Sequence, residues 1–249
     1  VIMALPKIET PIYELTLPSQ DIKVKYRPFS VKEEKILLIA QESAEKMNIT
    51  NTVVNVLGAC TFNSINLQEL PLFDIEYLFL NVRAKSVSEI TKFRVVCPDD
   101  LKTKVDIELD LTKVEVQVDD NHTNDIMLDE ERKLGVVFKY PSLNILDSNK
   151  IIDADEMKTE DLFKMMQSCI DHIYEGEKIY PAKDTTEKEM TEFLDSLQTS
   201  QFEKMQDFFK TMPVLKHEVE VENPKTKKKS TMTFQGISDF FSSASPTTH

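Results

Sequence analysis

The sequence predicts an α+β protein in which antiparallel β-hairpins are combined with amphipathic helices. Three observations support this fold class. Pairs of stretches that alternate apolar and polar residues are separated by short polar linkers, which is typical of hairpins. Longer stretches with apolar residues three and four positions apart follow helix-capping sequences. Hydrophobic residues make up 41% of the 249 residues, which is enough for a core.

The first half of the chain is predicted to contain a hairpin, three helices and several strands. Strands at 12–18 and 22–28 form the hairpin. Ser30 and Glu33 form a capping-box sequence that opens a helix ending near Met47, and a second helix leads to Cys60. A third helix has so broad an apolar face that it suits the centre of the core. Its range is 72–88, and the strands that follow lie at 93–97, 105–111, 114–118 and 135–140.

The second half is predicted to be mostly helical. One helix opens at Thr159 and continues past Cys169 to Ile173. Capping-box sequences at 186–189 and 200–203 open two more helices. Proline ends the last of these, because it cannot donate the backbone hydrogen bond that a helix interior requires. A hairpin of 215–221 with 230–234 and a short aromatic helical turn complete the chain.

The periodic pattern breaks at residues 141–155, which suggests an internal boundary. We therefore expect residues 1–150 to form an α+β domain. Residues 151–249 are expected to form a mostly helical C-terminal module that ends in the hairpin and a frayed tail. The sequence leaves open whether the two halves share one core, and we favour a compact body with a semi-independent C-terminal module.

Composition and charge exclude several function classes. Only four of the 249 residues are glycine, against an average of about 7%, and no GxGxxG, P-loop or GxSxG motif occurs. The net charge of −13 disfavours nucleic acid and anionic membranes as partners. No apolar run approaches the roughly 18 residues of a membrane-spanning helix. Between Asp99 and Glu131, twelve acidic residues face three lysines, which indicates a solvated face or a docking surface for a basic partner.

The cysteines and histidines form no catalytic or metal-binding pattern. Cys60, Cys97 and Cys169 lack metal-ligand spacing and fit a reducing compartment. Cys169 and His172 could share one helical face. No orienting group or oxyanion-hole motif accompanies them, so a Cys/His hydrolase is a remote alternative. We expect no enzymatic activity and predict no catalytic, cofactor-binding or metal-binding residue.

Aromatic and basic residues gather in the last third of the chain. Phe208, Phe209, Phe240 and Phe241 are either core residues or a partner surface, and we take them as the candidate partner interface. In that case, replacing Phe240 and Phe241 by alanine would leave the monomer folded and abolish partner binding. The lysines at 225 and 227–229 form a basic turn without interleaved aromatic residues, which is weak evidence for nucleic-acid binding.

Two segments carry a resemblance to a known family. One is FDIEYLFLNVRAKSVSE at 73–89, followed by the hairpin around Cys97 and Pro98. The other runs from QFEKMQDFFKTMPVLKHEVEV to TMTFQGISDFF in 201–241. Both resemble the baseplate hub and hub-assembly proteins of T4-type contractile-tailed bacteriophages. The resemblance implies a late phage protein that acts in building the central hub of the tail baseplate, and it does not separate an assembly factor from a structural subunit. We favour a chaperone-like assembly factor that acts on other hub proteins in the cytoplasm of the infected host, because the acidic, glycine-poor chain with its helix-capping sequences is suited to fold alone. A permanent structural subunit of the baseplate hub is the alternative, and the oligomeric state stays open.

The resemblance also raises the question of zinc. Cysteine pairs in the hairpins of some relatives suggest zinc knuckles. Here Cys97 is followed by Pro98-Asp99-Asp100, and the second hairpin carries Asn223-Pro224 and lysines. Because a lone thiol cannot complete a tetrahedral zinc site, plain hairpin packing is expected to replace it.

Overall fold

The structure is a computed structural model that describes residues 9–42, 46–148, 159–236 and 239–240. The chain forms two compact units. Unit 1 comprises Val1–Leu67, Phe73–Val116 and Leu215–His249, and unit 2 comprises Gln68–Leu72 and Gln117–Val214. Unit 2 is therefore largely an insertion in the sequence of unit 1.

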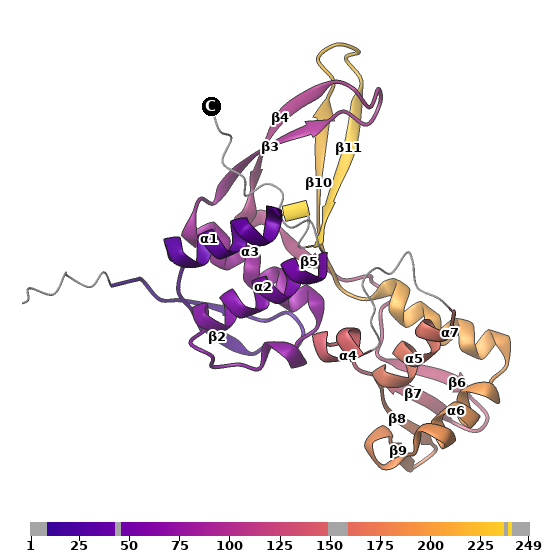
Figure 1. The fold of residues 1–249 in the computed structure, drawn as a ribbon. Coiled ribbons are helices and arrows are strands. Elements are labelled where there is room, and N and C mark those ends of the chain that lie inside the picture. Colours follow the sequence, from indigo (N-terminus) through magenta and orange to yellow (C-terminus); the bar gives the residue numbers. More distant parts are fainter. Residues whose placement is uncertain (1–8, 43–45, 149–158, 237–238, 241–249) are drawn as a thin grey trace, which may run out of the picture. The chain divides into compact units, whose positions relative to one another are not determined.

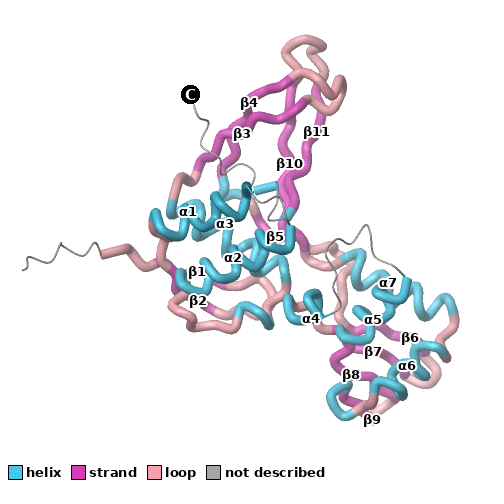
Figure 2. The backbone as a smooth tube through the Cα atoms, viewed as in Figure 1, coloured by secondary structure: helices cyan, strands magenta, loops and turns pink. Residues whose placement is uncertain are grey.

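Unit 1 combines helices with hairpins (Figures 1 and 2). Its first hairpin pairs β1 with β2 in an antiparallel register, and a second pairs β3 with β4. The third hairpin, β10 with β11, carries β5 on the other edge of β10. The elements are β1 (Tyr13–Thr16), β2 (Lys23–Tyr26), α1 (Val31–Glu42), α2 (Lys46–Cys60), α3 (Leu72–Ser86), β3 (Ile90–Val96), β4 (Lys104–Asp110), β5 (Glu115–Gln117), β10 (Val214–Glu222) and β11 (Lys229–Gln235), with 3-10 turns at Leu67–Glu69 and Leu111–Lys113.

Unit 2 is a four-stranded antiparallel sheet in the order β6-β7-β8-β9. Helices α5, α6 and α7 pack on it, because residues of all three share one buried cluster with β6, β7 and β8. The elements are β6 (Asp125–Asp129), β7 (Leu134–Phe138), α4 (Leu143–Ser148), α5 (Thr159–Cys169), β8 (Ile170–Glu175), β9 (Lys178–Pro181), α6 (Glu187–Asp195) and α7 (Thr199–Thr211), with a 3-10 turn at Ala182–Asp184.

The fold confirms the predicted α+β class and the three predicted hairpins, 12–18 with 22–28, 93–97 with 105–111 and 215–221 with 230–234, all of which lie in unit 1. The division of the chain differs from the expected one at residue 150. The structure instead returns to unit 1 at Leu215. The reason is that β10 lies between β11 and β5, so the last hairpin completes a sheet begun before the insertion.

Two predicted elements of unit 2 were wrong in detail. The helix from Thr159 ends at Cys169, and the next residues form β8 instead of continuing the helix to Ile173. The β-branched Ile170 and Ile173 pack on the sheet there, as β-branched residues favour strands. The capping box expected at 200–203 lies two residues earlier, where Gln198 caps α7 with Gln201.

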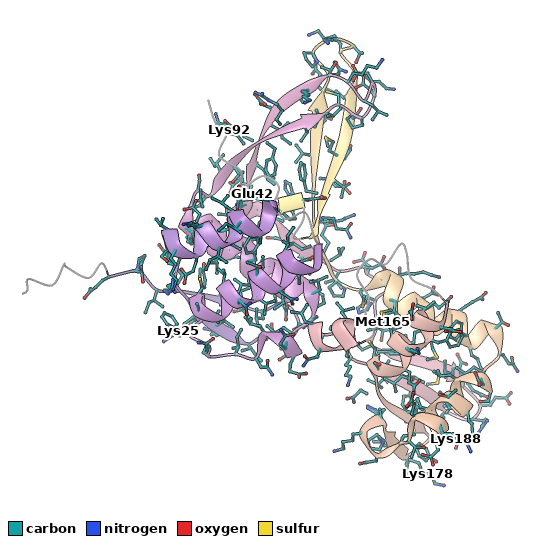
Figure 3. All side chains as sticks on the ribbon, in the orientation of Figure 1. Lys25, Glu42, Lys92, Met165, Lys178 and Lys188 are labelled. Carbon is teal, nitrogen blue, oxygen red and sulfur yellow. The ribbon has the colours of Figure 1, made fainter. Side chains whose placement is uncertain are left out.

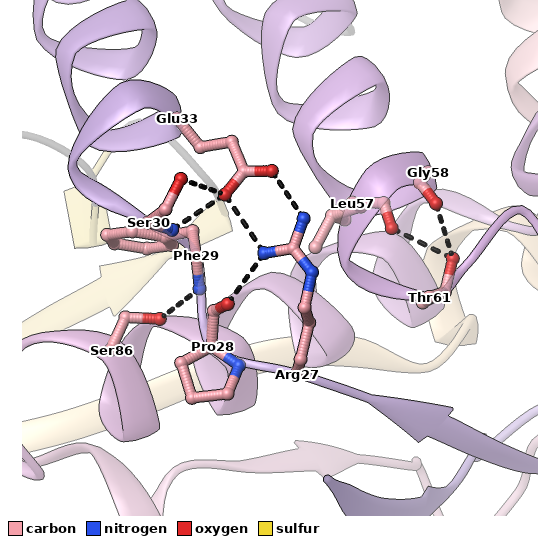
Figure 4. A network of polar contacts seen from close by, with 9 residues as sticks. All are labelled: Arg27, Pro28, Phe29, Ser30, Glu33, Leu57, Gly58, Thr61 and Ser86. Carbon is pink, nitrogen blue, oxygen red and sulfur yellow. Dashed lines mark hydrogen bonds and ion pairs between the residues drawn. The ribbon is translucent and has the colours of Figure 1, made fainter. Parts of the chain in front are cut away.

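A polar network fixes the start of α1 as the capping-box sequence predicted (Figure 4). The Glu33 carboxylate accepts the Ser30 N–H at 2.6 Å and the Ser30 hydroxyl at 2.9 Å. The Arg27 guanidinium donates to both carboxylate oxygens at 2.6 and 3.0 Å. These hydrogen bonds, that of Arg27 above all, lower the pKa of Glu33 to about 2. The neighbouring Phe29 N–H donates to Ser86 Oγ at 2.8 Å, which ties this corner to α3.

Candidate functional site

The β3–β4 and β10–β11 hairpins of unit 1 pack on each other through apolar side chains. The ring of Phe93 on β3 lies 5.1 Å from that of Phe234 on β11. The same buried cluster includes Leu80 of α3 and Phe240, so the hairpins rest on the central helix at their base. At their far ends the two hairpin tips lie side by side (Figures 1 and 2).

Both hairpins turn in the same way. Residues 97–100 are Cys-Pro-Asp-Asp and residues 223–226 are Asn-Pro-Lys-Thr. In each turn the N–H of the fifth residue, Leu101 or Lys227, donates to the carbonyl of the first, at 3.0 and 2.8 Å. Leu101 and Lys227 also adopt left-handed φ values of 53° and 60°. This backbone conformation is uncommon for residues other than glycine, so each turn holds a defined shape.

Hydrogen bonds join the two tips directly. The carboxylate of Asp99 accepts the Asn223 Nδ2–H at 2.9 Å and the Thr226 hydroxyl at 2.5 Å. The Asn223 side chain is 1% exposed, and its Oδ1 accepts the Lys225 N–H at 2.9 Å. The hydrogen bonds from Thr226 and Asn223 lower the pKa of Asp99. We term Asp99, Asn223 and Thr226 the tip junction.

The tip junction adds to the plain hairpin packing that the sequence predicted. Cys97 is buried at the start of the first turn, and burial raises the pKa of its thiol. Within the part of the chain that the structure describes, no group of three or more His, Cys, Asp or Glu residues is placed to hold a metal ion. The contact between the two tips is made by the hydrogen bonds of Asp99 with Asn223 and Thr226.

The four aromatic residues of the predicted interface lie in different surroundings. Phe208 belongs to the core of unit 2 and Phe240 to that of unit 1, and each side chain is 1% exposed. Phe209 is partly buried, and its ring packs edge-on against Phe208 at 4.9 Å. Phe241 lies outside the described residues. Partner contact at this set stays a prediction. Phe208 and Phe240 are core residues of the folded chain, so their rings have almost no exposed surface for contact with a partner.

Phe208 lies in the middle of an aromatic cluster that the sequence did not predict. Its ring stacks on Phe138 at 4.8 Å and on Tyr140 at 5.7 Å. His122 approaches it at 5.2 Å. The loop that carries His122 therefore folds back on α7 and β7, within unit 2.

Hydrogen bonds on both ring nitrogens fit a neutral His122. The Thr211 hydroxyl donates to the Asp207 carbonyl at 2.7 Å, so its oxygen is free to accept from His122 Nδ1 at 2.9 Å. The Tyr140 hydroxyl lies 3.0 Å from Nε2 and 3.3 Å from Asn124 Oδ1, and it can donate its single proton to the nearer Nε2. Burial lowers the pKa of His122, and the nearby Asp119 raises it by a smaller amount.

We expect His122 to make unit 2 less stable at mildly acidic pH. Its folded-state pKa lies below the ordinary value of 6.5. The contribution of neutral His122 to the free energy of unfolding is therefore complete above pH 6.5. It is lost as the pH falls through the folded-state pKa. The free energy of unfolding of wild type, followed by urea titration, should fall more between pH 7.5 and 5.5 than that of His122→Gln. Equal falls in both proteins would show that His122 does not titrate on unfolding.

The Cys169 and His172 side chains do not share a helix. Cys169 is the buried last residue of α5, and burial raises the pKa of its thiol to about 12. His172 lies on β8, where Nδ1 contacts the Asp171 carboxylate at 2.7 Å. A thiol that stays protonated at neutral pH is a poor nucleophile.

No helix among the described residues is long and apolar enough to cross a membrane.

The comparison with protein families gives the chain its class. A family model described as T4 bacteriophage base plate protein matches residues 10–242, which span both units. This chain therefore belongs to the T4 bacteriophage base plate protein family and is a phage baseplate protein. Comparison with curated proteins and with solved structures gave no match.

Proposed function

We propose that this protein is an assembly factor for the central hub of the baseplate, acting through protein–protein contacts with other hub proteins. One observation carries the proposal. The two segments that resemble hub and hub-assembly proteins, 73–89 and 201–241, meet in one core: Leu80 and Ala84 come from the first, and Leu215, Phe234 and Phe240 from the second. Parts of both segments therefore build the core of unit 1, while residues 201–214 belong to unit 2.

The proposed role requires a chain that folds before it meets its partners. Each unit has a buried apolar cluster of its own, one around Phe208 and one around Phe234. Since burial of apolar surface is the main favourable term in folding, separate cores support a protein that is stable in the host cytoplasm before assembly.

We further propose that the protein is not an enzyme. The buried, protonated Cys169 supports this proposal, as does the separation of its helix from the strand that carries His172. If the protein promotes assembly, it does so by holding partners in a competent arrangement. Full function of a Cys169→Ala, His172→Ala double variant in phage production would support this view, and loss of function with a folded protein would contradict it.

A permanent structural subunit of the hub is the second candidate, which the family's description as a base plate protein favours. Mass spectrometry of purified infectious particles, with a pull-down of the tagged protein from infected cells, separates the two roles. Hub proteins in the pull-down with none of this chain in the particle would support the assembly factor. A fixed copy number in the particle would support the subunit and contradict our proposal.

A further inference from the structure

The joined hairpin tips are basic in an acidic protein. Residues 97–104 and 222–229 together hold six lysines and three acidic residues, a net charge of +3 in a chain of net charge −13. Both hairpins contribute to it. We term five of these lysines the basic tip: Lys102, Lys104, Lys225, Lys227 and Lys228.

The side-chain charges of the basic tip are not paired within the described part of the fold. All five are exposed, and none forms an ion pair with a carboxylate in the described part of the chain. The sixth, Lys229, pairs with Glu220 at 2.7 Å. Basic residues lower on the first hairpin are also paired, Lys92 with Glu108 and Arg94 with Asp106. Nitrogen-ended side chains crowd the two tips in Figure 3.

The carboxylates of the same turns offset only part of the lysine charge, which leaves the net charge of +3, and two of them also hold the turns together. Asp99 is held by hydrogen bonds between the hairpins in the tip junction. Asp100 accepts the Thr103 N–H at 2.9 Å and the Thr103 hydroxyl at 2.6 Å within its own turn. Like charges that are held close together repel, and the two tips could reduce this repulsion by separating. The junction holds them together instead.

We propose that the basic tip is a docking surface for an acidic segment of a partner protein. The tip junction joins the two turns that carry the lysines, which reduces the cost of bringing their charges together on binding. An acidic protein segment is the occupant that the charges favour. A polyanion as extended as DNA would also meet the field of the remaining chain, which has a net charge of −13. No aromatic residue lies among residues 97–104 or 222–229 on which bases could stack.

The proposal can be tested with the full chain and a fluorescein-labelled poly-glutamate peptide as the probe. Fluorescence anisotropy at low salt should show binding that weakens as salt is added. The triple variant Lys225→Gln, Lys227→Gln, Lys228→Gln should bind at least about fivefold more weakly, since three exposed charge interactions are lost. The matched control is Lys25→Gln, Lys32→Gln, Lys35→Gln, which removes the same charge from exposed lysines of β2 and α1 in unit 1 (Lys25 is labelled in Figure 3). The control should change binding less than twofold.

Three results would overturn the proposal. They are no binding of the probe, equal weakening by the tip and control variants, and tighter binding of duplex DNA than of poly-glutamate at equal total charge. The last would make the tip a nucleic-acid site. These outcomes do not depend on whether the protein leaves the assembled baseplate, so they can be distinguished from failure of the proposed function.

A variant of the tip junction gives a second test, because the loss of charge and the loss of the junction are expected to change the binding affinity in opposite directions. Asp99→Ala removes a negative charge from the tip, so electrostatics alone predicts tighter binding of poly-glutamate. If the junction is what unites the lysines, binding should weaken at least about twofold. Thr226→Val removes one of the two junction contacts at constant charge and should weaken binding in the same direction. Tighter binding by a folded Asp99→Ala variant, checked by circular dichroism, would contradict the joined patch.

Discussion

Replacing Phe208 by alanine is expected to lower the free energy of unfolding of unit 2 by about 4 kcal/mol. The ring is 1% exposed and contacts Phe138, Phe209, Tyr140 and His122. Its removal loses both the transfer free energy of the ring and the contacts of the side chains around the cavity, because a packed core relaxes only in part.

Hydrogen exchange followed by mass spectrometry is the suitable measurement. The chain contains no tryptophan, so fluorescence reports poorly on its cores. Peptides from 117–214 should lose protection in Phe208→Ala, whereas peptides from unit 1 should keep it. Phe209→Ala is the control at the next position. Phe209→Ala should lower the free energy of unfolding of unit 2 by clearly less, since this side chain is only partly buried. Similar losses for both variants would mean that the cluster does not centre on Phe208.

Phe240→Ala is expected to destabilise unit 1 by about 3 kcal/mol, instead of leaving the monomer unaffected as a pure interface residue would. The side chain is 1% exposed and lies in the same cluster as Leu80 and Leu215. Its ring centroid is 6.3 Å from that of Phe234. Thus the end of the described chain contributes directly to the core beneath the two long hairpins.

The same exchange experiment separates the two interpretations of Phe240. Loss of protection in α3, β3 and β10 with unit 2 unchanged would establish the core role. Protection equal to wild type, together with loss of hub proteins from a pull-down, would instead establish the partner surface that the sequence suggested.

Local patterns predicted the parts of the fold that depend on local physics. The contact of Glu33 with Ser30, the capping box at Thr186, the central helix and the three hairpins of unit 1 all follow from spacing and turn residues. Strands β6 and β9 were missed. β9 is a short strand of four residues that are mostly exposed, so it carries little pattern. The signal that could have found it is Gly176, whose φ of 60° fits the two-residue turn between Glu175 and Lys178.

The site depended on contacts far apart in the sequence. Asp99 and Asn223 are 124 residues apart, and no spacing rule relates them. A comparison of the two turns could have helped, since both begin with a residue followed by proline and turn in the same way. The surroundings of His122 could not be predicted, because nothing local in the sequence indicates that Phe208 and Thr211 of α7 would cover it.

The insertion of unit 2 between β5 and β10 has a consequence for synthesis on the ribosome. Residues 117–214 emerge, and can close their own core, while the enclosing unit still lacks β10 and β11. Until those strands leave the exit tunnel, Phe93 and Leu109 lack the Leu215 and Phe234 side chains that cover them. A prematurely terminated chain would expose this apolar surface and attract host chaperones or proteases. Translation through β11 is therefore needed both to bury that surface and to supply the second half of the basic tip.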